Sequence, residues 1–385
     1  MSLPLLQRRP DSGLGNIRSS PGAPRRNIDW TLLVGQGLLT VIGCCVVFSA
    51  TRTRGGDPFS WVIRQVVFAI IATVVMVAVM ALDYEWLRDR ARALYALTIA
   101  VLAGLLVYGR VSGEGTILAF DVGPIQLQPA ELAKFTVLLA LCAFLTDDRT
   151  NEIDYPRFLG SLVLVGVPAL LIIAQPDLGT GSVIIALAMG VLLVAGAKLR
   201  YIIAISFLSL ITMGAAYVGN LVNTYQLERL KVFIDPENPE LDDSVFQVRN
   251  AIRAVGTGGV FGKGWLDGPL TNGRDVPVMW ADFPFAAVGE QFGLIGCAVL
   301  LGLFILVLVR IWRIAHLSRD MFGTYLCAGV FTMLLWQVFQ NVGMTVGIMP
   351  VTGLPMPFIS YGGSSLVTYF AMLGLVQSVH MRRMR

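Results

Sequence analysis

A glutamate and a lysine stand three residues apart at the start of one apolar run. The segment 126–134 reads Gln-Leu-Gln-Pro-Ala-Glu-Leu-Ala-Lys. Pro129 suits the first turn of a helix, because its missing N–H costs nothing there. Glu131 then complements the helix dipole, and Lys134 lies on the same helix face. The spacing predicts an ion pair, which either stabilises a helix start or keeps charge for chemistry at the mouth of an apolar helix.

A single aspartate, Asp282, precedes a second apolar run in the sequence Trp-Ala-Asp-Phe-Pro-Phe at 280–285. One interpretation is a helix N-cap, with Pro284 in the first turn. The other is an isolated carboxylate among aromatic residues, where low polarity would raise its pKa toward that of a general base. Glu290 would lie about 80° round the helix and about 12 Å deeper. The two carboxylates therefore do not form a glycosidase-type pair.

Seven glycines and Lys263 gather in the segment 256–273. A nucleotide P-loop requires Gly-x4-Gly-Lys-Ser/Thr. Here Thr257 occupies the position of the first glycine and Gly264 occupies the last position, so this motif is excluded. A looser role remains open, in which the glycine amides together with Lys263, Arg249 and Arg253 hold a diphosphate.

The segment 341–365 contains three prolines within eight residues and ends in Ser-Tyr-Gly-Gly-Ser-Ser. The prolines predict a re-entrant turn between two apolar runs. A simple loop explains the breaks but not the density of small and hydroxyl residues at a membrane surface. The candidate binding residues here are Asn341, Ser360, Tyr361, Gly362, Gly363 and Ser364.

The elements that must position these residues are apolar helices. Of the 385 residues, 55% are hydrophobic and 14% are charged, against about 25% charged in soluble domains. This composition excludes a soluble enzyme, a nucleic-acid binder and a disordered scaffold. Runs long enough to cross a bilayer predict an all-α, polytopic integral membrane protein with about ten spans, and continuous runs exclude a β-barrel. The expected spans are 28–50, 61–82, 94–108, 132–145, 158–174, 179–197, 201–220, 285–311, 325–347 and 361–379.

The distribution of lysine and arginine predicts the orientation of the chain. With a cytoplasmic N-terminus, the inside segments hold eighteen of these residues and the short outside loops hold three, which satisfies the positive-inside rule. We expect a flexible cytoplasmic tail at 1–27, a transmembrane domain at 28–379 and a cytoplasmic C-terminus at 380–385. One long extracellular loop, 220–284, precedes the eighth span, so the polar segments face outward.

No resident metal or cofactor is expected. All five cysteines fall within the expected spans, and both histidines lie at cytoplasmic span ends. Their spacing does not match a zinc site. A divalent cation, Mg or Mn, stays open as a companion of a diphosphate group.

In these motifs the chain resembles the SEDS family (shape, elongation, division and sporulation), whose members are polytopic peptidoglycan glycosyltransferases. The motifs run in order along nearly the whole chain, and 341–365 is the strongest of them. Its sequence resembles the elongation (RodA) branch more than the division (FtsW) branch. The matching segments are 126–134 (with Ala130 where the family has serine), 175–181, 225–235, 254–264, Asp282-Phe with Glu290, and 341–365.

The resemblance implies polymerisation of lipid II at the outer face of the cytoplasmic membrane, during cell elongation. Asp282 matches the family's essential aspartate, and Glu131 and Lys134 match its conserved pair in the same cavity. Lys134, Arg64, Arg110 and Lys263 are the candidate cations for the leaving diphosphate, and Gln128 and Gln247 join the expected substrate-binding residues.

The resemblance also implies partners: lipid II and the nascent glycan strand, a class B penicillin-binding protein that cross-links the product, and other membrane proteins of the elongation complex. No nucleic acid is expected. Three alternatives stay open, namely a lipid II flippase, a division-type paralogue and a non-catalytic scaffold. A flippase favours internal repeats and polar residues along an alternating-access path, and the sequence shows no convincing repeat of its halves.

Overall fold

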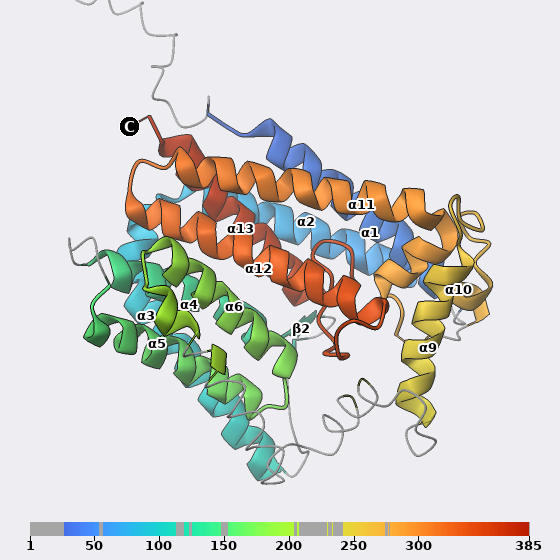
Figure 1. Ribbon diagram of the computed structural model, residues 1–385, viewed down its shortest axis with the longest axis horizontal. Coiled ribbons are helices and arrows are strands. Elements are labelled where there is room, and N and C mark those ends of the chain that lie inside the picture. The colour runs from blue at the N-terminus through green and yellow to red at the C-terminus, as the bar shows by residue number, and fades with distance from the viewer. Residues whose placement is uncertain are drawn as a thin grey trace, which may run out of the picture.

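The protein is a bundle of long helices with one small hairpin (Figure 1). The computed structural model describes residues 27–53, 57–112, 119–122, 125–147, 153–203, 206–207, 229, 233, 242–273, 276 and 278–384. The elements are α1 (Trp30–Thr51), α2 (Ser60–Ala81), α3 (Tyr84–Ser112), β1 (Phe120–Val122), β2 (Ile125–Leu127), α4 (Pro129–Thr146), α5 (Tyr155–Ile173), α6 (Leu178–Val194), α9 (Asp242–Thr257), α10 (Pro269–Gly273), α11 (Pro284–His316), α12 (Met321–Thr345) and α13 (Gly363–Arg382).

The prediction of a polytopic all-α membrane protein is confirmed. Among the described residues, seven helices are long and apolar enough to cross a bilayer: α1 to α5, α11 and α12. The shorter apolar α6 and the 20-residue α13 coincide with two further expected spans. The tail 1–26 and most of the expected span 201–220 lie outside the described residues. Helix α3 begins ten residues before the expected span, because its charged first turns are helical without being apolar.

The hairpin β1–β2 was not expected from the sequence. Its register pairs Phe120 with Leu127, Asp121 with Gln126 and Val122 with Ile125. Three residue pairs are too few to give a clear alternating pattern. The hairpin is fixed instead by a tertiary contact, since the Ser364 hydroxyl at the start of α13 donates to the Gln126 carbonyl.

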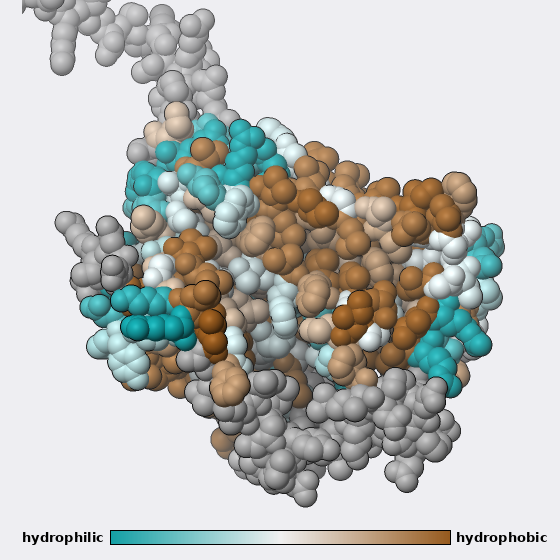
Figure 2. All heavy atoms as spheres, viewed as in Figure 1, coloured by the Kyte–Doolittle hydropathy of each residue, from teal (hydrophilic) through white to brown (hydrophobic). Residues whose placement is uncertain are grey.

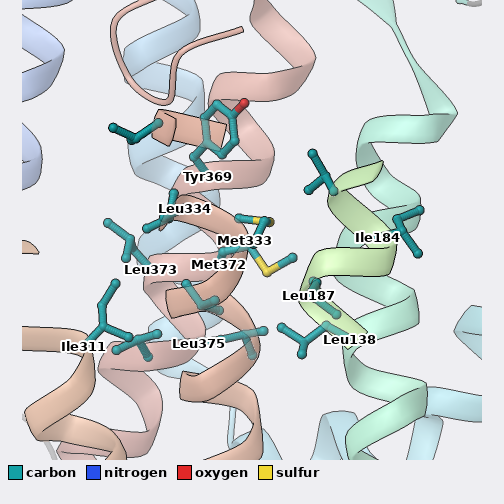
Figure 3. Close-up of a cluster of buried hydrophobic side chains, with 14 of the residues drawn as sticks. Leu138, Ile184, Leu187, Ile311, Met333, Leu334, Tyr369, Met372, Leu373 and Leu375 are labelled. Carbon is teal, nitrogen blue, oxygen red and sulfur yellow. The ribbon is translucent and has the colours of Figure 1, made fainter. Parts of the chain in front are cut away.

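The core of the bundle lies where α4, α6, α11, α12 and α13 meet. Figure 3 shows Leu138 of α4, Leu187 of α6, Met333 of α12 and Met372 of α13 turned toward one another. On the face in Figure 2, apolar side chains cover the middle, and hydrophilic ones gather toward its ends. Helices α9 and α10 lie at one end of the bundle and the C-terminus at the other (Figure 1).

Helix α11 is broken at Gly293, which has φ +64° and ψ −158°. A break in a membrane helix frees backbone groups that must find other partners. The glycine-rich segment supplies them: Leu294 and Ile295 donate to the carbonyls of Gly259 and Val260, while Lys263 and Gly264 donate to those of Glu290 and Gln291.

The glycines of this segment allow that close backbone approach. A Cβ at Gly258 would lie 1.9 Å from the Gly289 carbonyl oxygen, and one at Gly262 would lie 2.1 Å from that of Gln291. The amides of Gly262, Lys263 and Gly264 already donate to backbone carbonyls. The sequence-based expectation that they cradle a diphosphate is therefore replaced by a structural role.

We expect Gly293→Ala to lower the free energy of unfolding by about 2 kcal/mol or more, because alanine is strained at this φ and its Cβ would lie 2.4 Å from the Gly262 amide nitrogen. The measurement is the thermal midpoint of the purified protein in lipid nanodiscs. Gly302→Ala in the same helix is the control, since no atom lies within 4 Å of its Cβ position. Equal midpoints for the two variants would contradict the role of the break.

Candidate active site

Asp282 lies immediately before the N-cap of α11, so the capping interpretation is wrong. Phe283 is the N-cap residue, no side chain caps this helix, and Pro284 occupies its first turn. The Asp282 amide instead donates to the Val278 carbonyl at 3.0 Å, which closes a turn before the helix. The carboxylate is thereby left for another role.

The surroundings of this carboxylate change its acidity. Burial raises the pKa of Asp282 above its ordinary value, and the positive charge of Arg229 opposes that rise without cancelling it. A carboxylate that is desolvated in this way is a stronger base than an exposed one. The site therefore holds a group suited to act as a general base.

Two side chains hold the backbone of Asp282 in place. Asn341 donates from Nδ2 to the carbonyls of Asp282 (2.8 Å) and Leu354 (2.9 Å). Ser360 donates to the Ala281 carbonyl at 2.6 Å and accepts from the Met356 amide at 2.8 Å. Both are buried. Asn341 and Ser360 were expected to bind substrate. Their hydrogen-bond donors instead bind backbone carbonyls at and beside Asp282, so we assign them as positioning residues.

The predicted ion pair of α4 is present. Lys134 Nζ lies 2.6 Å from Glu131 Oε1, and the two side chains are 0% and 3% exposed. The second oxygen of Glu131, Oε2, is buried without a hydrogen-bond partner. Desolvation strengthens the attraction between opposite charges. The two side chains therefore hold each other in a fixed position inside the bundle.

Tyr369 connects this ion pair to the segment beside Asp282. Lys134 Nζ lies 5.6 Å from the centre of the Tyr369 ring. The Tyr369 hydroxyl accepts from Gln337 at 2.8 Å and donates to the Pro355 carbonyl at 3.4 Å. Pro355 follows Leu354, whose carbonyl Asn341 binds. The pair and Asp282 are thus linked indirectly, through 354–355.

The remaining residues of the 360–364 motif fix the start of α13. The Ser364 hydroxyl accepts from the Gln128 amide at 3.1 Å. A Cβ at Gly363 would lie 2.5 Å from the Phe68 ring, so this glycine lets α2 approach α13. The Tyr361 ring packs against Trp61, which also packs against Trp280. Gly362 is the N-cap of α13.

The expected cations and amides are dispersed. Arg64 is exposed on α2, and Gln247 is half-buried on α9. Lys263 is exposed beside Glu290, about two helical turns along α11 from Asp282. Gln128 Nε2 donates to Asp177, the N-cap of α6, at 3.3 Å. The side chain of Arg110 lies outside the described residues.

Glu290 serves a different element from Asp282, as its predicted depth implied. Its side chain accepts from the amides of Leu270 and Thr271, both at 2.8 Å, and from the Thr271 hydroxyl at 2.5 Å. The carboxylate is fully buried. It therefore fixes the start of α10 against α11 and is not a partner of Asp282.

Arg229 is the residue at this site that sequence reasoning did not select. Its Nη1 donates to the Val351 carbonyl at 3.4 Å. An ideal Cβ at Gly353 would lie 3.3 Å from Arg229 Nη1 and 3.9 Å from Asp282 Oδ2. The two charged groups thus converge on Gly353. The only sequence signal for Arg229 was its place within the matching segment 225–235.

The site has no cluster of metal ligands in the part of the chain that the structure describes. No three histidine, cysteine or acidic side chains come together there. Mg²⁺ is commonly held by one or two carboxylates and the phosphates of a substrate. Asp282 is the one carboxylate described here that offers such a ligand beside Gly353.

These features define a polytopic helical membrane protein with a desolvated carboxylate and a cation at one end of its bundle. The chain belongs to the FtsW/RodA/SpoVE family, because the model of that family, described as "Cell cycle protein", matches residues 29–385.

Curated relatives match along nearly their whole lengths. The peptidoglycan glycosyltransferase MrdB of Escherichia coli (strain K12) is 33% identical over 362 residues, which cover 93% of this chain and 94% of MrdB. Stage V sporulation protein E of Bacillus subtilis (strain 168) is also 33% identical, over 91% of this chain and 96% of the relative. The similarity is therefore not confined to one motif.

Solved structures share the fold. A chain from a peptidoglycan synthase complex that coordinates polymerisation and crosslinking has a TM-score of 0.75 and 28% identity, and covers 93% of this chain and 99% of its own length. The rod shape determining protein RodA of Thermus thermophilus has a TM-score of 0.69 and 28% identity, over 93% and 98% of the two chains. The arrangement of the helices is thus that of this family.

We expect Lys134→Met to lower the free energy of unfolding by about 3–5 kcal/mol, because it leaves Glu131 buried and unpaired. The double variant Glu131→Gln/Lys134→Met should recover part of that loss, since no charge then remains. Thermal midpoints in nanodiscs measure both. The exposed pair Arg92–Asp147 is the control, and Arg92→Gln there should cost less than about 1 kcal/mol. A loss for Lys134→Met no larger than for Arg92→Gln contradicts the prediction.

Proposed function

We propose that this protein is a peptidoglycan glycosyltransferase that polymerises lipid II into β-1,4 glycan strands at the outer face of the cytoplasmic membrane. The observation that carries the proposal is Asp282, a desolvated carboxylate of raised pKa held in place by Asn341 and Ser360. The 33% identity to a peptidoglycan glycosyltransferase over 93% of the chain supports it.

In the proposed mechanism, Asp282 is the general base. It removes the proton from the 4-hydroxyl of the acceptor's N-acetylglucosamine as that oxygen attacks the anomeric carbon of the donor's N-acetylmuramic acid. The bond from that carbon to the diphosphate oxygen breaks, and undecaprenyl diphosphate leaves. One displacement inverts the α-linked donor to a β-linked product, so a single carboxylate suffices and no covalent sugar–enzyme intermediate forms.

The other charged groups support this step. Negative charge that develops on the leaving diphosphate requires cations nearby. The ion pair of Glu131 and Lys134 supports the site structurally, because Tyr369 links it to the 354–355 backbone beside Asp282. A divalent cation, Mg or Mn, would enter with the substrate's phosphates and be held mainly by them.

The elongation role is favoured over the division role. MrdB of Escherichia coli is 33% identical to this chain, and the RodA of Treponema pallidum is also among its relatives. Division-type FtsW relatives are similar too, at 32% identity for that of Halomonas elongata. This difference is small, so the division-type paralogue stays as the alternative, as does a lipid II flippase.

A transpeptidase is the proposed partner. One structural relative belongs to a complex in which polymerisation is coordinated with crosslinking. A polymerase acting alone leaves uncrosslinked strands, and a class B penicillin-binding protein would supply the crosslinks. Lipid II and the growing strand are the proposed substrates, and further membrane proteins of an elongation complex are proposed neighbours.

Replacing Asp282 by asparagine keeps the size of the side chain but removes the base, so we expect the rate of polymerisation to fall at least about 10²-fold. The assay follows glycan polymer formed from purified lipid II, with a penicillin-binding partner present whose transpeptidase serine is mutated. Glu290→Gln is not a suitable control, because Glu290 fixes α10. Arg90→Gln, at an exposed position near the start of α3, is suitable.

The pH profile tests the same assignment. A base is active when deprotonated, so the rate should fall as pH decreases through the pKa of Asp282. Because that pKa is raised, the acidic limb should lie above the range expected for an exposed aspartate. Full activity of Asp282→Asn would move the base elsewhere. Transbilayer movement of lipid II without polymer would favour the flippase.

We further propose that both termini are cytoplasmic and that the site faces outward, as the distribution of arginine and lysine indicates. The C-terminus and α9–α10 lie at opposite ends of the bundle (Figure 1), which supports this orientation. Lys263→Cys should therefore react with a membrane-impermeant maleimide in intact spheroplasts, and Arg200→Cys only after permeabilisation. The reverse pattern would overturn the orientation.

A further inference from the structure

Gly353 lies beside both charged groups of the site. It has φ +70°, a conformation that favours glycine. A side chain at this position would project toward both Arg229 Nη1, at 3.3 Å, and Asp282 Oδ2, at 3.9 Å. Because residue 353 has no Cβ, no side chain of its own crowds the guanidinium or the carboxylate.

We propose that Arg229 is a catalytic residue that binds the diphosphate of the lipid-linked sugar donor, facing Asp282 across Gly353. This assignment rests on the proposed glycosyl transfer and names the group that receives its leaving anion. Asp282 then takes the proton from the acceptor, and Arg229 stabilises the negative charge that passes to the diphosphate oxygen when the anomeric bond breaks.

The placement of the other expected cations supports this choice. The Lys134 ammonium is fully buried and lies 2.6 Å from Glu131. Arg64 and Lys263 are exposed, the first on α2 and the second beside Glu290. Arg229, in contrast, is half-buried and lies within the electrostatic reach of Asp282.

The chemistry of the guanidinium suits this ligand. Arginine presents planar, paired N–H donors that match the oxygens of a phosphate, and it stays charged at any physiological pH. Its contact with the Val351 carbonyl ties the guanidinium to the loop that carries Gly353. In a partly desolvated site, such charge-assisted bonds are stronger than in water.

Arg229 reduces the repulsion between two negative groups, the Asp282 carboxylate and the donor diphosphate. A diphosphate near Asp282 would repel its carboxylate, and a nearby anion raises the pKa of such a group further. Arg229 offsets this repulsion while the donor is bound. When the phosphates of the donor pair with Arg229, less of its positive charge acts on Asp282. The pKa of Asp282 then rises, so its carboxylate is a stronger base than in the empty site.

The experiment measures binding of undecaprenyl diphosphate, the expected product, to the full-length protein in nanodiscs, with neutral undecaprenol as the reference lipid. Arg229→Gln should weaken binding of the diphosphate lipid about tenfold to a hundredfold, with undecaprenol unchanged. Arg229→Lys, which keeps the charge but loses the paired donors, should fall between Arg229→Gln and wild type. Arg90→Gln removes one exposed positive charge near the start of α3, far from the proposed site in sequence, and should bind within twofold of wild type.

The outcomes separate this proposal from the proposed function. Asp282→Asn should bind the diphosphate lipid as well as or better than wild type, because a like charge is removed. Loss of binding in Arg229→Gln supports the diphosphate site even if Asp282→Asn still polymerises lipid II. Binding by Arg229→Gln and Arg229→Lys equal to wild type overturns it, and so does a wild type that does not distinguish the diphosphate lipid from undecaprenol.

The acidic limb of the pH profile gives a second readout that does not depend on binding. The positive charge of Arg229 lowers the pKa of Asp282, so Arg229→Gln should move the acidic limb of kcat/KM to higher pH. Arg229→Lys should leave it near the wild-type position, because the charge remains. An unshifted limb in a folded Arg229→Gln variant, judged by its thermal midpoint, overturns the proposed facing arrangement.

Discussion

The two hydrogen bonds from the Asn341 amide determine where the reactive groups of this protein stand. One bond holds the carbonyl of Asp282 before α11, and the other holds that of Leu354 in the segment after α12. Ser360 adds a second tie between the same two segments. Because both side chains are buried, water competes little for these bonds. This connection fixes the position of Asp282 relative to Gly353. It also positions Arg229, which donates to the Val351 carbonyl in the same segment.

The bilayer imposes the second constraint, which is that backbone groups within it be satisfied by the protein. The break at Gly293 in α11 would otherwise leave amides and carbonyls without partners. The glycine-rich segment pairs with them, and Glu290 binds the start of α10 a turn away. The segment 256–273 is thus secured to α11 about two helical turns from Asp282. The unusual composition of 256–273 serves this packing.

The charged side chains also follow from the cost of removing charge from water. The pair of Glu131 and Lys134 is fully desolvated and held within the bundle, where an unpaired charge would be very costly. Asp282 and Arg229 both lie beside Gly353, and the positive charge of Arg229 acts on the Asp282 carboxylate. A base and a cation close to one another suit the proposed reaction, in which a proton and a leaving anion move apart.

The sequence alone determined the membrane class, most of the spans, the ion pair of α4 and the solitary character of Asp282, since apolar run length and helical spacing are local properties. It did not determine the roles of Asn341, Ser360 or the glycine-rich segment, the hairpin β1–β2, or the importance of Arg229. Those depend on contacts between segments distant in the chain: Asn341 and Asp282 are 59 residues apart, and Arg229 and Val351 are 122 apart. Only the tertiary structure decides which of these polar groups face each other and which bind the backbone. The reason is that hydrogen bonds between distant segments produce no periodic pattern in the sequence.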